Sequence, residues 1–313
     1  MSEEQTVTAR EKAAGNIVVA AGVCVWATHF LVTDVLLETW DPYLITTGRL
    51  LSGAFFLMIS YAVATQGHPL RRIPWRPALL LGAVGISGST IFLTLGVKYA
   101  GPVPAAIVAA SAPIVAAFVA RVGFRLPLTV SVMVGAVVAF AGGVFAAIGG
   151  ELDDVGNLRG GELMMLAAIT IFSWYSIGAQ RWLTGLSQIG ITAITILIGG
   201  LTMVVIMPIL ILLGIAEMRF QLDWESIGYL LFLGAGPASF ALFTWHWGVS
   251  RIGVTIASIY SNLAPVVVVV IRMIQGEPPE AEHLIGGLLI ICGVLIAQLL
   301  PAGKPKHLSG EAL

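Results

Sequence analysis

Charge is scarce in this sequence. Only 11% of the 313 residues are charged and 58% are hydrophobic, whereas a soluble domain carries about 25% charged residues. A water-soluble fold could not bury so much apolar surface, so the composition excludes a soluble globular protein. The formal net charge of −1 gives no basis for a nucleic-acid partner, because nucleic-acid-binding surfaces carry an excess of cations.

Cysteine and intramembrane carboxylates are also scarce. The two cysteines, Cys24 and Cys292, lie in apolar stretches, and we interpret them as buried, unreactive thiols rather than a disulfide or a metal pair. We expect no metal, no cofactor and no catalytic residue. No carboxylate is expected at mid-membrane, because Asp34 lies near the end of its segment. A proton relay, which commonly uses Asp, Glu or His, would depend on His29 or His246, so the absence of proton coupling is the simpler expectation.

Long apolar runs fill the rest of the chain. A membrane-spanning helix needs about 20 mostly apolar residues. The first run is too long for the core of a cleavable signal peptide, so we expect it to remain as a membrane helix. The segments expected to span the membrane are 15–36, 42–65, 77–98, 102–120, 128–149, 161–181, 188–213, 226–249, 254–271 and 284–300.

The basic residues predict the orientation of these ten spans. Loops on the cytoplasmic side carry an excess of Lys and Arg. With the N-terminus inside, eleven of the sixteen Lys and Arg residues fall on the cytoplasmic side, four fall outside, and Arg49 lies within the second span. Both termini are therefore expected in the cytoplasm. Four tryptophans at span ends fit the interfacial belt: Trp40, Trp75, Trp182 and Trp224.

The chain resembles itself at a shift of 152 residues. Residues 81–113 and 233–265 share eleven identities over 33 ungapped positions, including Ala112-Pro113 against Ala264-Pro265. Trp26 also matches Trp174 at a shift of 148. We therefore expect two five-helix repeats, 15–150 and 160–300, between cytoplasmic tails 1–14 and 301–313. Five spans per repeat force the second repeat to insert upside down, as in many secondary transporters, which bind substrate near the midplane between repeats.

These repeats resemble a known family. The stretches from Gly101 to Pro113 and from Gly253 to Pro265, each followed by a glycine-rich last helix, resemble the drug/metabolite transporter superfamily and its EamA-type members. The turn at Gln275-Gly276-Glu277-Pro278 also fits, whereas Gly123-Phe124-Arg125 lacks the corresponding glutamate. Within the superfamily the chain is most similar to bacterial aromatic amino-acid exporters of the inner membrane. The resemblance implies a carrier in the lipid bilayer that exports Phe, Tyr, Trp and related amphipathic small molecules through a cavity between the halves. We expect the protein to be a monomer.

Polar and aromatic residues inside the spans are the candidates for the binding site. Such groups are costly in a bilayer and usually face the interior of the bundle or a cavity. An aromatic lining with a few polar groups suits an amphipathic small molecule. Tight packing in the core is the competing interpretation of each residue. The candidates are Trp26, His29, Trp174, Tyr175, Trp245, His246, Tyr260 and Asn262.

Two prolines occupy equivalent positions in the fourth and ninth spans. Pro113 and Pro265 each remove a helix hydrogen bond and free a carbonyl four residues earlier. The pair could form the hinge for alternating access, or could be a static kink that shapes the bundle.

Other functions are also compatible with parts of the sequence. Gly85-Ile86-Ser87-Gly88 fits the short motif of intramembrane serine proteases, with a histidine as base, but the inverted ten-span repeat does not fit that family. A channel or a non-transporting sensor is a third possibility. Among transporters, a sugar-phosphate or nucleotide-sugar carrier is the alternative. It would need buried cations for phosphate, and only Arg49 is clearly inside a span, whereas Lys98 and Arg272 lie near span ends.

Overall fold

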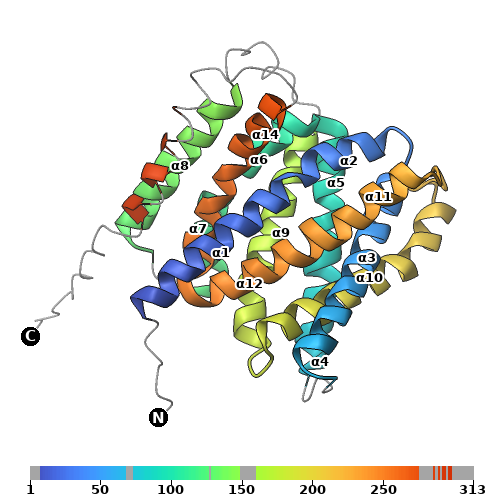
Figure 1. Cartoon of the computed structure of the whole chain (residues 1–313), viewed down its shortest axis with the longest axis horizontal. Helices are drawn as coiled ribbons and strands as arrows, with labels where there is room; N and C mark the ends of the chain where they lie inside the picture. The colour runs from blue at the N-terminus through green and yellow to red at the C-terminus, as the bar shows by residue number, and fades with distance from the viewer. Residues whose placement is uncertain are drawn as a thin grey trace, which may run out of the picture.

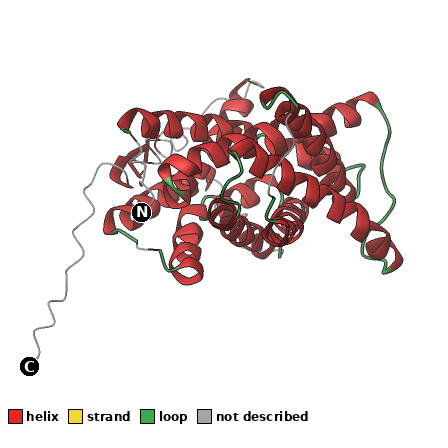
Figure 2. Cartoon of the chain, turned by 90° about the horizontal axis from the view of Figure 1, so that it is seen from below, coloured by secondary structure: helices red, strands yellow, loops and turns green. Residues whose placement is uncertain are grey.

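The computed structural model describes residues 8–67, 73–126, 128–148 and 160–274, with 285, 288–289, 291–293 and 295–297 near the C-terminus. Within these residues all regular structure is helical (Figure 2). The helices of the first half are α1 (Ala9–Ala27), α2 (His29–Leu37), α3 (Pro42–Ala64), α4 (Trp75–Leu80), η1 (Leu81–Gly88), α5 (Ser89–Ala100), α6 (Pro102–Ala109), α7 (Ala112–Phe124) and α8 (Val130–Ile148).

The second half repeats this order after a connection that lies outside the described residues. Its helices are α9 (Gly161–Trp182), α10 (Gln188–Leu212), α11 (Trp224–Leu233), η3 (Gly234–Phe240), α12 (Ala241–Ile252), α13 (Val254–Ile259), η4 (Tyr260–Asn262) and α14 (Leu263–Ile274). Most of the expected tenth span, 284–300, also lies outside them, although its described residues are helical.

The described helices have the lengths and surfaces of a membrane protein. Six continuous stretches are long and apolar enough to cross a bilayer, namely 9–37, 42–64, 75–100, 161–182, 188–212 and 224–252. With 102–124, α8, 254–274 and the last segment they complete the ten spans. Large apolar side chains such as Val63, Phe118 and Leu212 project outward, 76%, 65% and 87% exposed. The expected ten-helix membrane fold is confirmed.

Caps placed at the loops determine where several helices begin. Asp41 accepts a hydrogen bond from the backbone N–H of Tyr43, and Pro42 occupies the first turn of α3. Ser187 caps α10 in the same way. Asp223 caps α11 by accepting from the N–H of Ser226 at 2.7 Å, and this backbone hydrogen bond lowers the pKa of the Asp223 carboxyl. These contacts satisfy donors that helix geometry leaves free.

Several spans are interrupted where the sequence predicts one helix. The third and eighth spans each contain a π-helical segment, η1 and η3, at equivalent positions. The fourth span breaks at Ala110–Ser111, so that Pro113 lies in the first turn of α7. The ninth span contains the 3₁₀ turn η4, which ends at Asn262, three residues before Pro265. Local irregularity of this kind is common at functional sites.

The two π-helical segments make the same contacts across the halves. Ser87 donates to the carbonyl of Gly199 in α10 at 2.9 Å, and Ser239 donates to the carbonyl of Gly53 in α3 at 2.9 Å. Thr46 donates to Thr94 at 3.1 Å in the first half. In the second half Thr192 and His246, the equivalents of Thr46 and Thr94, are 2.8 Å apart. Matching these contacts aligns α3 with α10 at a shift of 146 residues.

The first helices of the two repeats, α1 and α9, align at the same shift of 146 residues. A Cβ on Gly15 would touch α12 at the carbonyl of Gly248, and a Cβ on Gly161 would touch α5 at the carbonyl of Gly96. Gly15 and Gly161 are 146 residues apart, so the contacts pair Trp26 with Phe172. This corrects the pairing of Trp26 with Trp174 at a shift of 148. Figure 1 shows α1 and α12 lying side by side.

The halves are also joined at the end of the molecule where α2 finishes and α11 begins (Figure 1). Arg219 donates to the carbonyls of Glu38 at 2.9 Å and Trp40 at 3.1 Å. The Nε1 of Trp40 donates to the carbonyl of Gln221 at 3.1 Å. Trp40 is only 7% exposed, so it packs between the halves and is not the interfacial ring that its place at a span end predicts.

The cysteines also differ from the expectation. Cys24 and Cys292 are both free thiols and both exposed on the helix surface. The prediction that they are buried was wrong. The reason is that a uniformly apolar helix does not reveal which of its faces is turned outward.

Candidate functional site: a cavity between the two repeats

A cavity of about 110 Å³ lies between the repeats. Twelve of its lining residues come from the first half and twelve from the second. Equivalent positions recur on its wall, such as Ile86 with Ala238 and Ala109 with Ser261. The cavity therefore surrounds the pseudo-twofold axis, where carriers built from inverted repeats bind their substrates.

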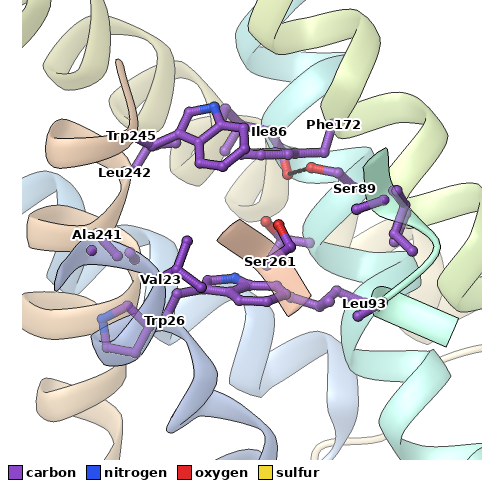
Figure 3. Close-up of a pocket in the computed structure, with 18 of the residues that line it drawn as sticks. Val23, Trp26, Ile86, Ser89, Leu93, Phe172, Ala241, Leu242, Trp245 and Ser261 are labelled. Atoms are coloured by element: carbon purple, nitrogen blue, oxygen red, sulfur yellow. Dashed lines mark hydrogen bonds between the residues drawn. The ribbon is translucent and has the colours of Figure 1, made fainter. Parts of the chain in front are cut away.

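Two indole rings form opposite walls of this cavity. Figure 3 shows Trp26 and Trp245 on opposite sides, with Val23 and Ser261 between them in this view. Trp245 is fixed by donating from Nε1 to Ser176 Oγ at 3.0 Å. The Phe172 ring lies against it, with ring centroids 5.4 Å apart. Rings fixed in this way offer flat apolar faces to a ligand.

The Trp26 indole, near the end of α1, is supported from behind by the first residues of α2. Its ring centroid lies 5.3 Å from that of Phe30, edge to face, and 4.8 Å from that of His29. His29 is fully buried, and its Nδ1 lies 2.7 Å from the carbonyl oxygen of Trp26. His29 therefore contacts a wall residue and is not itself one of the lining residues.

Tyr175 and His246 lie together behind the Phe172 side of the wall. Their ring centroids are 5.4 Å apart and both side chains are fully buried. The Tyr175 hydroxyl is 2.8 Å from Thr195 Oγ1, and His246 Nδ1 is 2.8 Å from Thr192 Oγ1. These hydrogen bonds satisfy the polar atoms that face α10.

The remaining sequence candidates lie farther from the cavity. Trp174 packs edge to face against Trp182 at 5.7 Å, near the end of α9. Tyr260 is partly buried against the core cluster that contains Trp245. Asn262 is fully buried and donates from Nδ2 to the carbonyl of Ile259 at 3.1 Å. Of the eight candidates, Trp26 and Trp245 are lining residues.

The cavity wall also contains residues that the sequence did not single out. Phe172 and four serines line it, namely Ser89, Ser173, Ser258 and Ser261. Ser89 donates to the carbonyls of Gly85 and Ile86, and Ser258 donates to the carbonyl of Thr255. Because these two hydroxyl hydrogens are already engaged, the oxygen lone pairs remain as acceptors.

Arg49 is the charged residue of the lining. It is 5% exposed, and its Nε and Nη1 have no hydrogen-bond partner among the described residues. The available signal was the position of a cation inside an apolar span, which by default marks a functional site. The sequence alone predicts a role for Arg49 only as a possible ligand for phosphate.

The serine-protease interpretation finds no support in this geometry. Ser87 is 1% exposed and its hydroxyl donates to the carbonyls of Gly82 and Gly199. It therefore bridges helices and makes none of the contacts of a nucleophile with a histidine base. Within the described part of the chain, no three His, Cys, Asp or Glu side chains are placed to hold a metal ion.

Known proteins share both the sequence pattern and the fold. A model of the EamA-like transporter family matches residues 13–148 and again residues 159–299. A crystal structure of another protein, 24% identical in sequence, superposes with a TM-score of 0.74 and covers 94% of this chain and 99% of that chain. That likeness concerns the fold.

Curated relatives include proteins named as transporters. The uncharacterized transporter YyaM of Bacillus subtilis is 26% identical over 70% of this chain and 72% of that protein. The aromatic amino acid exporter YddG of Ancylobacter novellus is 24% identical over 92% and 98% of the two chains. A probable terminal-alkyne amino-acid exporter of Streptantibioticus cattleyicolor is 23% identical over 92% and 94%.

Proposed function

Because this chain belongs to the EamA-like transporter family, whose members are membrane transporters and not enzymes, we propose that it exports aromatic amino acids and related amphipathic metabolites. The observation that carries the proposal is the cavity between the repeats, with an indole ring from each half on its walls. Two relatives named as exporters of amino acids support the same substrate class.

In the proposed mechanism the aromatic ring of the substrate lies between Trp26 and Trp245. Contact with these faces removes apolar surface of the substrate from water. Each Å² buried contributes about 25 cal/mol of favourable binding free energy. The acceptor oxygens of Ser89 and Ser258 receive the ammonium group of the substrate. Rocking of one repeat against the other exposes the cavity to each side in turn, with the breaks next to Pro113 and Pro265 as hinges.

The proposal includes the cellular setting and the driving force. The carrier works as a monomer in the bacterial inner membrane, with both termini in the cytoplasm. It is an uncoupled facilitator, and substrate moves down its own gradient. The cavity lining supports this part, because no Asp, Glu or His is among the described lining residues.

The test is a flux assay on purified protein in liposomes. We expect Phe, Tyr and Trp to cross faster than in protein-free liposomes, and a sugar phosphate to cross no faster than in that control. A carrier of sugar phosphates is the alternative, favoured by the cation Arg49, whose Nε and Nη1 have no partner among the described residues. Faster flux of the sugar phosphate than of any aromatic amino acid would replace the proposed substrate class with this one.

A further inference from the structure

Arg49 is a buried cation, and two of its nitrogens have no partner in the part of the chain that the structure describes. It lies seven residues after the start of α3, so its Cα is about 10 Å along the helix axis from that end. Only 5% of the residue is exposed, and it faces the cavity. Neither Nε nor Nη1 of Arg49 has a hydrogen-bond partner among the described residues. No Asp or Glu among those residues forms an ion pair with Arg49.

Two other arginines that contact the helix bundle are well supplied with partners. Arg219 donates to the carbonyls of Leu37, Glu38 and Trp40. Arg251 stacks over the Trp247 ring, with Cζ 3.4 Å from the centroid, and also donates to the Trp247 carbonyl. In the described structure these two arginines, which serve packing, therefore have hydrogen-bond acceptors or a ring as partners. Arg49 differs from them and requires an explanation.

The second repeat fills the equivalent position without charge. At the shift of 146 residues, Arg49 corresponds to Thr195, and His29 corresponds to Tyr175. Tyr175 and Thr195 are hydrogen-bonded to each other at 2.8 Å. In the first repeat His29 is fully buried, and its Nε2 has no hydrogen-bond partner among the described residues. A neutral, satisfied pair is therefore compatible with this fold, and packing does not demand the arginine.

Burial of an uncompensated guanidinium is strongly unfavourable. An oxyanion in the cavity would remove that penalty, because guanidinium and carboxylate form parallel, charge-assisted hydrogen bonds. We propose that Arg49 is the carboxylate-binding residue of the cavity and selects substrates that carry a free carboxylate beside an apolar ring. This inference rests on the proposed function, since it assigns the polar end of the aromatic amino acid to one side chain.

Arg49 is also expected to affect the stability of the ligand-free protein. If Arg49 is kept for a ligand and not for packing, its apolar replacement Arg49→Met is expected to raise the melting temperature of the ligand-free protein. The same variant is expected to lose the stabilisation that tryptophan gives the wild type. A purely structural arginine gives the opposite result, with a lower melting temperature.

The transport test uses four related compounds: L-tryptophan, L-tryptophanamide, tryptamine and indole-3-propionate. Liposomes contain the wild type, Arg49→Gln, Arg49→Lys, or the control Lys98→Gln, which removes an exposed cation in the last turn of α5. In Arg49→Gln we expect tryptophan and indole-3-propionate fluxes to fall by about tenfold to a hundredfold, while the fluxes of the amide and the amine change by less than about twofold. Arg49→Lys is expected to recover part of the loss, and Lys98→Gln to behave as wild type.

Equal loss for all four compounds, or an unchanged preference for the carboxylates, overturns the assignment of Arg49. If the wild type carries none of the four, the proposed substrate is wrong, and the arginine is then tested by thermal stabilisation with benzoate, benzamide and inorganic phosphate. Stabilisation by benzoate alone that disappears in Arg49→Gln supports the carboxylate site. Stabilisation by phosphate alone, or by none of the three, overturns it.

Discussion

Trp245 and His246 are neighbours in α12 and have opposite surroundings. Trp245 faces the cavity, whereas His246 faces α10 and contacts Thr192. Successive residues of an α-helix point about 100° apart, so a run of polar and aromatic residues places only one or two of them on any wall. The rest must find partners in the packed layer behind, as His246 does.

At the residue scale the tryptophans give a matched comparison. Trp26→Ala and Trp245→Ala each remove a wall of the cavity, and we expect each to weaken the apparent affinity for L-tryptophan by roughly tenfold, in line with about 1.5 kcal/mol for an aromatic contact. Trp174→Ala is the control, because that ring packs on Trp182 away from the lining. Apparent affinities from flux against concentration measure the effect. Equal weakening in all three variants would show that the cavity walls have no special role.

The sequence could predict part of this site and not the rest. Trp26 and Trp245 were candidates because large amphipathic rings inside a span are unusual. Phe172 and the lining serines gave no such signal, because apolar and hydroxyl residues are common on every face of a membrane helix. Arg49 gave a clear signal, but its importance depends on the absence of partners, which only packing in three dimensions can show.

At the scale of helices, glycines determine how closely the two halves approach. A Cβ on Gly82 would lie 2.6 Å from the Cβ of Ile198 in α10, and a Cβ on Gly234 would lie 2.0 Å from Ser52 Oγ in α3. These separations are shorter than van der Waals contact, so the π-helical segments can cross the opposite repeat only through glycine.

Alanine substitution tests this requirement. We expect Gly82→Ala and Gly234→Ala each to destabilise the protein by about 1–3 kcal/mol, because a methyl group forces the crossing helices apart. Gly228→Ala is the control, since a Cβ on this residue of α11 meets nothing within 4 Å and alanine favours the helix. Melting temperatures in detergent provide the measurement. A Gly82→Ala variant could prove as stable as the wild type and form the same cross-links between the two repeats. That result would contradict the proposed role of the glycine.

The sequence predicted the spans better than their interruptions. Hydropathy averages over about 20 residues, so it located α3, α9 and α10 within a few residues. It could not detect the break at Thr28 between α1 and α2 or the π-helical segments, because these depend on hydrogen-bond register. The repeat itself was visible in residues 81–113, whereas the shift of the less similar first helices became clear only from the contacts of Gly15 and Gly161.

At the scale of the whole molecule, charge predicts how the repeats insert. With both termini inside, the connections 38–41 and 214–223, joined through Arg219 and Asp41, lie on the outer side. We expect a cytoplasm-active reporter fused after Leu313 to function and a periplasm-active reporter at the same position to remain silent. A reporter inserted after Gly214 should show the reverse. Periplasmic activity after Leu313 would require the opposite orientation of all ten spans.

The last prediction concerns the driving force. The described cavity lining has Arg49 as its charged residue and contains no Asp, Glu or His. His29 and His246 are fully buried behind the walls. Glu162, in the first turn of α9, is at the end of its span, and its buried Oε2 has no partner among the described residues. A proton relay commonly needs a titratable group that meets the substrate pathway, and this lining offers none.

We therefore expect transport to equalise substrate concentrations and to go no further. Purified protein in liposomes begins with equal L-tryptophan on both sides, and a pH gradient of either sign is imposed with the membrane potential clamped at zero. The expected result is no net accumulation, although exchange of labelled substrate continues. Sustained accumulation that disappears in His29→Gln or His246→Gln would identify that histidine as a proton carrier, because glutamine keeps a hydrogen-bonding side chain without the titration. Accumulation that survives both substitutions and disappears in Glu162→Gln would instead place the coupling at the end of α9.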